Sequence, residues 1–421
     1  MRSAVLRSAA LAALLAAPAA YAQQTVRIPE RDTPLALRTT PVFAIGVEEG
    51  RDWEMFSGVE QVAFDRNDNL YVLDGGGHRV LVFDRTGKFV RQVGKQGGGP
   101  GEFLVPVSLA VLADGTLAVG DLGHRSYSLF GRDGRYLRSV SFGEEWMPML
   151  GGSELAAHPR GGVVSPMRPA LGMRMNGGPR VQTIRSLPIV WQSFTAGAKP
   201  VRLFDAPSEL RTQQSASPGR GGGQRVSFRV SGPPAFSPEL NWGVLPGGGL
   251  AVSHTAGYTV RVLDANGRLV RYIQKPMRVR KVTEADRERE RDRRREALRS
   301  GEGMRMVTVG GPGGGGGRAP RPMAPSREQI EEQIREMEFA ETIPAIQNLR
   351  VDHAGRLWIE RTGRVWGEPG PIDLVTAEGR YLGTITGQRL PQAFSPSGRV
   401  AYVERDDLGV QRVIVRQLPR L

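Results

Sequence analysis

The feature that most constrains the fold is a repeat of about 47 residues, in which a tight turn leads into a short apolar strand. Asn69 to Asp74 aligns with Thr116 to Asp121 at an offset of 47 residues. Repeats of this length are typical of folds in which each copy is one structural unit. The same pattern returns at four further places, giving six copies: residues 161–165, 249–253, 356–359 and 399–403.

Each copy holds enough short strands for one small antiparallel sheet. The turns are rich in glycine, aspartate and asparagine, which tolerate the positive φ that hairpins require. Four copies continue into a third strand, a glycine turn and a fourth strand; the third strands begin at Val80, Tyr127, Val260 and Ile372. Four short strands every 40 to 50 residues are typical of a propeller blade. The sequence therefore predicts an all-β fold, a six-bladed β-propeller.

The N-terminal region supports closure of the ring. Residues 42–46 and 53–56 repeat the pattern of residues 92–94 and 101–103. We expect residues 42–46 to be the outer strand of the last blade, whose other three strands come from about residues 391–417. Such a seam leaves no open sheet edge at the point where the ring closes.

Blade three is the least regular copy, because 87 residues separate Val163 from Leu250. Residues 185–194 and 200–204 complete this blade in our interpretation. We expect residues 206–239 to be a flexible insertion with one extra strand at 225–230. A seventh blade is the alternative.

A second insertion, residues 276–342, is the part least like a propeller. Thr283 begins a charged helix to about Arg299, and a capping box at Ser326 begins a second helix to about Ala340. A Gly-rich segment joins the two helices. One interpretation is a lid over the channel mouth, docked through the apolar residues Ile330, Ile334 and Met337. The alternative is a disordered appendage, because the segment has little other apolar surface.

Residues 1–22 are typical of a cleavable signal peptide. Arg2 and Arg7 precede an apolar run from Ala9 to Ala20, and small residues flank the expected cleavage site after Ala22. The run is too short to span a bilayer. The mature chain, residues 23–421, is expected to be periplasmic or secreted, without a membrane span and as a monomer.

Composition excludes several classes of function. The chain has no cysteine, so it has no disulfide, thiolate nucleophile or cysteine-ligated zinc. Its net charge of +14 is carried mainly by arginines dispersed through strands and turns. We interpret this as arginine used in place of lysine, with attraction to acidic surfaces as the alternative. The Gly-rich runs near 220 and at 310–317 lack the residues of a phosphate loop and the aromatic residues that stack on bases, so no nucleic-acid partner is expected.

The segment from Gly97 to Phe103, followed by Pro106 and the strand at 117–121, resembles the NHL-type repeat of six-bladed propellers. Asp74 to Val80 is similar to the stretch between the second and third strands of that family. The resemblance implies that the loop ending in Phe103 lies at the mouth of the central channel. NHL-type propellers include protein and RNA binders, sensors and metal-dependent lyases, so it implies a fold and no single activity.

Four side chains in matching loops are candidate ligand contacts: His78, Arg79, His124 and Arg125. Each pair follows an aspartate, Asp74 or Asp121. The four side chains would converge on an anion or a carbonyl at the channel mouth; the alternative is a structural aspartate–arginine pair in each blade. No histidine spacing suggests a metal site, no carboxylate pair suggests an acid and base, and no cofactor is expected. Catalytic residues remain unassigned.

We therefore expect an exported protein that binds a protein or small ligand at the channel-mouth face. The alternatives are a hydrolase or lyase with its active site at the channel mouth, and a structural component of the cell envelope.

Overall fold

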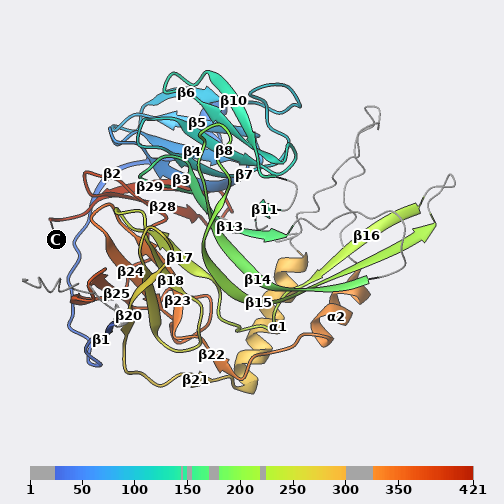
Figure 1. The fold of residues 1–421 in the computed structure, drawn as a ribbon, viewed down its shortest axis with the longest axis vertical. Coiled ribbons are helices and arrows are strands. Elements are labelled where there is room, and N and C mark those ends of the chain that lie inside the picture. The colour runs from blue at the N-terminus through green and yellow to red at the C-terminus, as the bar shows by residue number, and fades with distance from the viewer. Residues whose placement is uncertain are drawn as a thin grey trace, which may run out of the picture.

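The computed structural model describes residues 24–143, 146–148, 154–169, 180–218, 224–299 and 326–420. They form a ring of six sheets around a central channel, one sheet for each repeat (Figure 1). The predicted six-bladed β-propeller is confirmed. The predicted signal peptide lies outside the described residues, and no helix within them is both long and apolar enough to cross a membrane.

Blades one and two follow the predicted pattern, with four strands each from the channel outward. Their two middle strands are buried at every position, because each face of the sheet packs against a neighbouring blade. Blade one consists of β3 (Val59–Phe64), β4 (Leu70–Asp74), β5 (Arg79–Phe83) and β6 (Phe89–Val93). Blade two consists of β7 (Pro106–Val111), β8 (Leu117–Asp121), β9 (Ser126–Phe130) and β10 (Tyr136–Ser141).

Blades four to six repeat this arrangement. Blade four contains β17 (Asn241–Val244), β18 (Leu250–Ser253), β19 (Thr259–Leu263) and β20 (Leu269–Gln274). Blade five contains β23 (Ile346–Val351), β24 (Arg356–Arg361), β25 (Ile372–Thr376) and β26 (Tyr381–Ile385). Blade six contains β27 (Ala393–Phe394), β28 (Arg399–Arg405) and β29 (Gln411–Gln417) from the C-terminal region.

The N-terminal belt, residues 24–45, covers the outer edges of these three blades. Its last strand, β2 (Thr40–Ile45), pairs with β29 and completes blade six, as the sequence predicted. Its first strand, β1 (Gln24–Arg27), pairs in parallel with β20 and was not predicted. Between them, the backbone of Thr33 and Leu35 bonds to Thr384 on β26. The belt thus satisfies backbone groups that open sheet edges would otherwise expose.

A buried charge cluster holds the belt at the junction of blades four and five. We call it the belt latch; it comprises Lys275, Asp32, Asp373 and Arg361. The Lys275 ammonium, fully buried, lies 2.6 Å from Asp32 and 3.2 Å from the buried Asp373. Arg361 contacts the same two carboxylates at 2.6 and 3.4 Å. Two cations and two carboxylates therefore compensate one another, with Lys275 and Asp373 closed to water and Asp32 partly exposed.

Blade three differs from the prediction. Its main strands are β12 (Ala156–Ala157), β13 (Val163–Pro169), β14 (Arg180–Gln192), β15 (Val201–Pro218) and β16 (Gln224–Ser231), with the short β11 (Trp146–Pro148) beside β13. Within the segment expected to be flexible, residues 206–239, the predicted strand at 225–230 is present as β16, but it pairs with an extension of β15 that was not predicted. Pairing with the long β14 satisfies the backbone of this extension, which projects beyond the ring (Figure 1).

The second insertion forms two helices, α1 (Glu284–Arg299) and α2 (Arg327–Arg335), flanked by the paired β21 (Arg280–Lys281) and β22 (Thr342–Ile343). The predicted capping box at Ser326 is present. Ile330 and Ile334 are buried. Phe339 packs on Phe236, with ring centroids 5.9 Å apart, so the helices are attached to the connection between blades three and four. The Gly-rich joint lies outside the described residues, and the lid remains a prediction.

Candidate functional site

The channel-mouth face is built by the connections between blades and by the loops between second and third strands. In the loop that enters blade two, the Glu102 carboxylate accepts the N–H of Gly99 at 2.8 Å. This bond and the nearby Lys95 lower the pKa of Glu102. Glu54 accepts the N–H of Arg51 at 2.7 Å in the loop that enters blade one. The two loops are therefore closed in the same way, as their sequence similarity predicted.

The two loops that hold the predicted ligand contacts are each organised by one buried aspartate. Asp74 accepts the backbone N–H groups of Ser57 and Gly58 at 2.9 and 2.8 Å. Asp121 accepts those of Leu104 and Val105 at 2.8 and 2.9 Å. Each aspartate thus ties the connection from the preceding blade to the loop that follows its own strand.

Arg79 is part of this framework. Its side chain is buried and donates from Nε to Asp74 at 3.0 Å. Its remaining nitrogens contact the Asp52 carboxylate and the carbonyl oxygens of Asp52 and Met55. With these bonds made, the guanidinium supports the loop and is not available to a ligand. The alternative interpretation, a structural aspartate–arginine pair, describes blade one.

Blade two replaces that arginine with a histidine. His124 Nδ1 lies 2.9 Å from the Asp121 carboxylate, and its Nε2 is buried without a hydrogen-bond partner in the described structure. The backbone angles of these loops follow the 47-residue offset of the repeat, which pairs His78 with Arg125 and not with His124. His78 and Arg125 both adopt a left-handed conformation, with φ of 53° and 52°, and are the equivalent pair.

The four predicted side chains do not form one cluster. Within the described ranges, no hydrogen bond or ion pair joins the His78 loop to the His124 loop. Arg125 contacts the Met147 sulfur at 3.2 Å, on the side of blade three. A ligand role stays a prediction for His78, His124 and Arg125. No group of three histidines and carboxylates that could hold a metal occurs in the described part of the chain.

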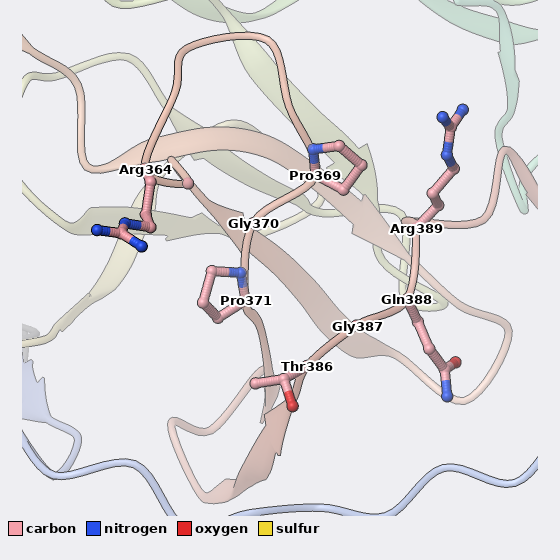
Figure 2. A pocket seen from close by; sticks show the side chains of 9 residues that line it. Arg364, Pro369, Gly370, Pro371, Thr386, Gly387, Gln388 and Arg389 are labelled. Atoms are coloured by element: carbon pink, nitrogen blue, oxygen red, sulfur yellow. The ribbon is translucent and has the colours of Figure 1, made fainter.

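A hollow on the same face, which we call the rim pocket, was missed by sequence reasoning. It has a volume of about 480 Å³ and lies between residues 363–371 of blade five and the connection 386–389 to blade six. Exposed Arg364 and Arg389 flank it on opposite sides (Figure 2). Gln388 donates to the Leu37 carbonyl at 2.6 Å, which fixes one wall to the N-terminal belt.

The rim pocket has an unbalanced charge. Neither Arg364 nor Arg389 makes a side-chain hydrogen bond or ion pair within the described ranges. Glu368 lies in the same loop but does not line the pocket. The arrangement suits an anionic group. Two arginines, three residues after β24 and four residues after β26, were the available sequence signal, because both strands end at the channel-mouth face.

Comparisons with known proteins agree with the fold. A family model described as 6-bladed beta-propeller matches residues 49–125. That match supports the architecture and does not confirm the NHL type. The sequence matches no curated protein.

Solved structures with a similar fold share little sequence with this chain. A candidate exported protein from Bacteroides fragilis is 11% identical, with 94% of this chain and 100% of that one covered and a TM-score of 0.47. A gluconolactonase from Xanthomonas campestris is 13% identical, with 91% and 100% covered and a TM-score of 0.43. A streptogramin B lyase is 8% identical, with 90% and 98% covered and a TM-score of 0.38. These similarities carry no information about the ligand, substrate or location of this chain.

Proposed function

We propose that this protein is an exported recognition protein whose channel-mouth face binds a ligand bearing an acidic group in the rim pocket. The supporting observation is the pair Arg364 and Arg389, which flanks a hollow of about 480 Å³ and lacks an acidic partner in the described structure. Guanidinium groups bind carboxylate and phosphate oxygens with paired hydrogen bonds. The net charge of +14 also favours the approach of an acidic ligand.

The pocket is suited to recognition because its walls are fixed. Gly370 packs so closely that an added Cβ would lie 1.8 Å from the carbonyl oxygen of Arg361. Gly370 N–H also donates to the buried Glu360 carboxylate at 3.2 Å. A fixed site loses little conformational entropy when it binds a ligand.

Calorimetric titration of the purified chain with citrate and with a glutamate-rich peptide tests the proposal. We expect at least one probe to bind, with an affinity that falls as salt screens the charges. The double variant R364Q/R389Q should lose this binding. Arg135→Gln is the matched control, because Arg135 is exposed on the turn between β9 and β10, away from the rim pocket.

Capture from the exported fraction then separates a protein partner from a small ligand. A partner retained by the wild-type chain and by R135Q, but not by R364Q/R389Q, would carry the acidic group itself. The proposal is wrong if neither probe binds the wild-type chain, or if the double variant binds as the wild type does.

A further inference from the structure

The six inner strands end in register around the central channel. In each blade, the residue after the inner strand donates its N–H to the carbonyl of the residue four positions later, so the strands can be compared position by position. The penultimate residue of the inner strand is an arginine in blade five and a small residue in the other five blades. In blade order these residues are Ala63, Ala110, Ala156, Gly243, Arg350 and Ala393. Arg350 therefore has room to extend.

Two residues earlier, the same strands are mostly polar. The residues at this level are Gln61, Ser108, Glu154, Asn241, Asn348 and Pro391. Residues two apart in a strand point to the same side. Gln61 shows that this side is the channel, because its side chain bonds the backbone of Leu109 in blade two and of Leu155 in blade three. A polar level thus lies next to the level of small residues.

Arg350 crosses the channel in the same manner. Its guanidinium, on blade five, forms an ion pair with Glu154 on blade three, although the inner strand of blade four lies between them in the ring. Both side chains keep some exposure, 24% for Arg350 and 31% for Glu154. Water therefore reaches the pair.

Arg350 has few other partners. Its Nε atom is buried and makes no hydrogen bond. Burial lowers the pKa of Arg350 to about 10, so the group stays cationic at neutral pH. The nearby Glu360 already accepts Asn348 Nδ2 at 2.6 Å and the Gly370 N–H at 3.2 Å. Glu154 is thus the one carboxylate in direct contact with this guanidinium in the described structure.

We propose that Arg350 is the anchor of a channel site for a small carboxylate, and that Glu154 occupies this site in the ligand-free protein. A carboxylate accepts two parallel hydrogen bonds from guanidinium, and the Glu154 side chain shows that the channel admits such a group. Asn241 and Asn348 lie at the adjacent polar level, whereas the Gln61 amide and Asn348 Nδ2 are already bonded to protein groups. This site is separate from the rim pocket and does not depend on it.

Titration of the purified chain with acetate and succinate, and with inorganic phosphate at matched ionic strength, tests the site. Glu154→Gln removes the internal carboxylate and frees Arg350. We expect succinate affinity to rise about tenfold or more in E154Q. Phosphate should bind more weakly than succinate. The site holds one guanidinium, and the group that it binds in the ligand-free protein is the carboxylate of Glu154.

The double variant E154Q/R350M provides the decisive comparison. It removes both charges of the pair, so neither is left without its partner, and the buried Glu360 keeps its hydrogen bonds from Asn348 and Gly370. This variant should lose succinate binding, whereas R364Q/R389Q should keep it. The proposal is overturned if E154Q does not bind succinate, if E154Q/R350M still does, or if phosphate binds better than both carboxylates.

Discussion

Replacing the buried Lys275 with methionine tests whether the belt latch holds the N-terminal belt on the ring. Methionine keeps much of the volume of lysine and removes the charge. Asp373 would then be fully buried with Arg361, at 3.4 Å, as its remaining ion-pair partner in the described structure, beside the Thr384 hydroxyl. Removing one partner of a buried ion pair costs about 3 to 5 kcal/mol. The pair with Asp32 adds less, because Asp32 is 39% exposed and its charge is screened by solvent.

Two further variants separate charge from packing. K275M/D373N removes both buried charges and should recover about 1 to 3 kcal/mol of the loss in free energy of unfolding. Lys95→Met is the control, because Lys95 forms an ion pair at 3.3 Å while 73% exposed, where such pairs contribute about 0 to 1 kcal/mol.

Urea unfolding followed by tryptophan fluorescence measures these differences, and limited proteolysis reports release of the belt. In K275M, cleavage within residues 24–38 should accelerate before the ring unfolds. The reasoning is refuted if K275M is as stable as K95M, or if the losses of the single variants at 275 and 373 simply add in the double variant.

Three other predictions concern the loops, the pH dependence and the insertion. Gly94→Ala should lower the free energy of unfolding by about 1 to 3 kcal/mol, since φ is +75° and a Cβ would lie 2.1 Å from the Phe103 ring; Gly98→Ala, with open space around it, should leave urea unfolding unchanged. Burial raises the pKa of Asp32, but hydrogen bonds from the latch cations outweigh this effect and leave the pKa lowered. The stability difference between wild type and Asp32→Asn should therefore be present at pH 6 and shrink as the pH falls below about 4; a constant difference would contradict it. Phe339→Ala should speed proteolysis between α1 and β22 while the thermal midpoint of the ring stays within about 2 °C, and an unchanged proteolysis rate would show that this ring does not dock the insertion.

The candidate site was only partly predictable. The loops that hold His78 and His124 were located from glycine turns and strand ends, which are local signals. The partners of these side chains were not predicted, because Arg79 contacts residues more than 20 positions away, in the loop that enters blade one from blade six. The equivalence of His78 and Arg125 follows from the 47-residue offset, and our pairing of His78 with His124 overlooked it. The rim pocket joins two connections that the chain visits separately.

The sequence by itself determined the parts of this protein that depend on neighbouring strands. Hairpin turns, apolar strands and a 47-residue period specify each blade locally, and the repeat count and the β2 seam follow from them. Only the tertiary structure decided where β1 docks, that Lys275 meets Asp32 across 243 residues of sequence, and that Arg350 faces Glu154. The physical reason is that hydrogen bonds between adjacent strands repeat with the sequence, whereas contacts across the channel or along the rim depend on closure of the whole ring.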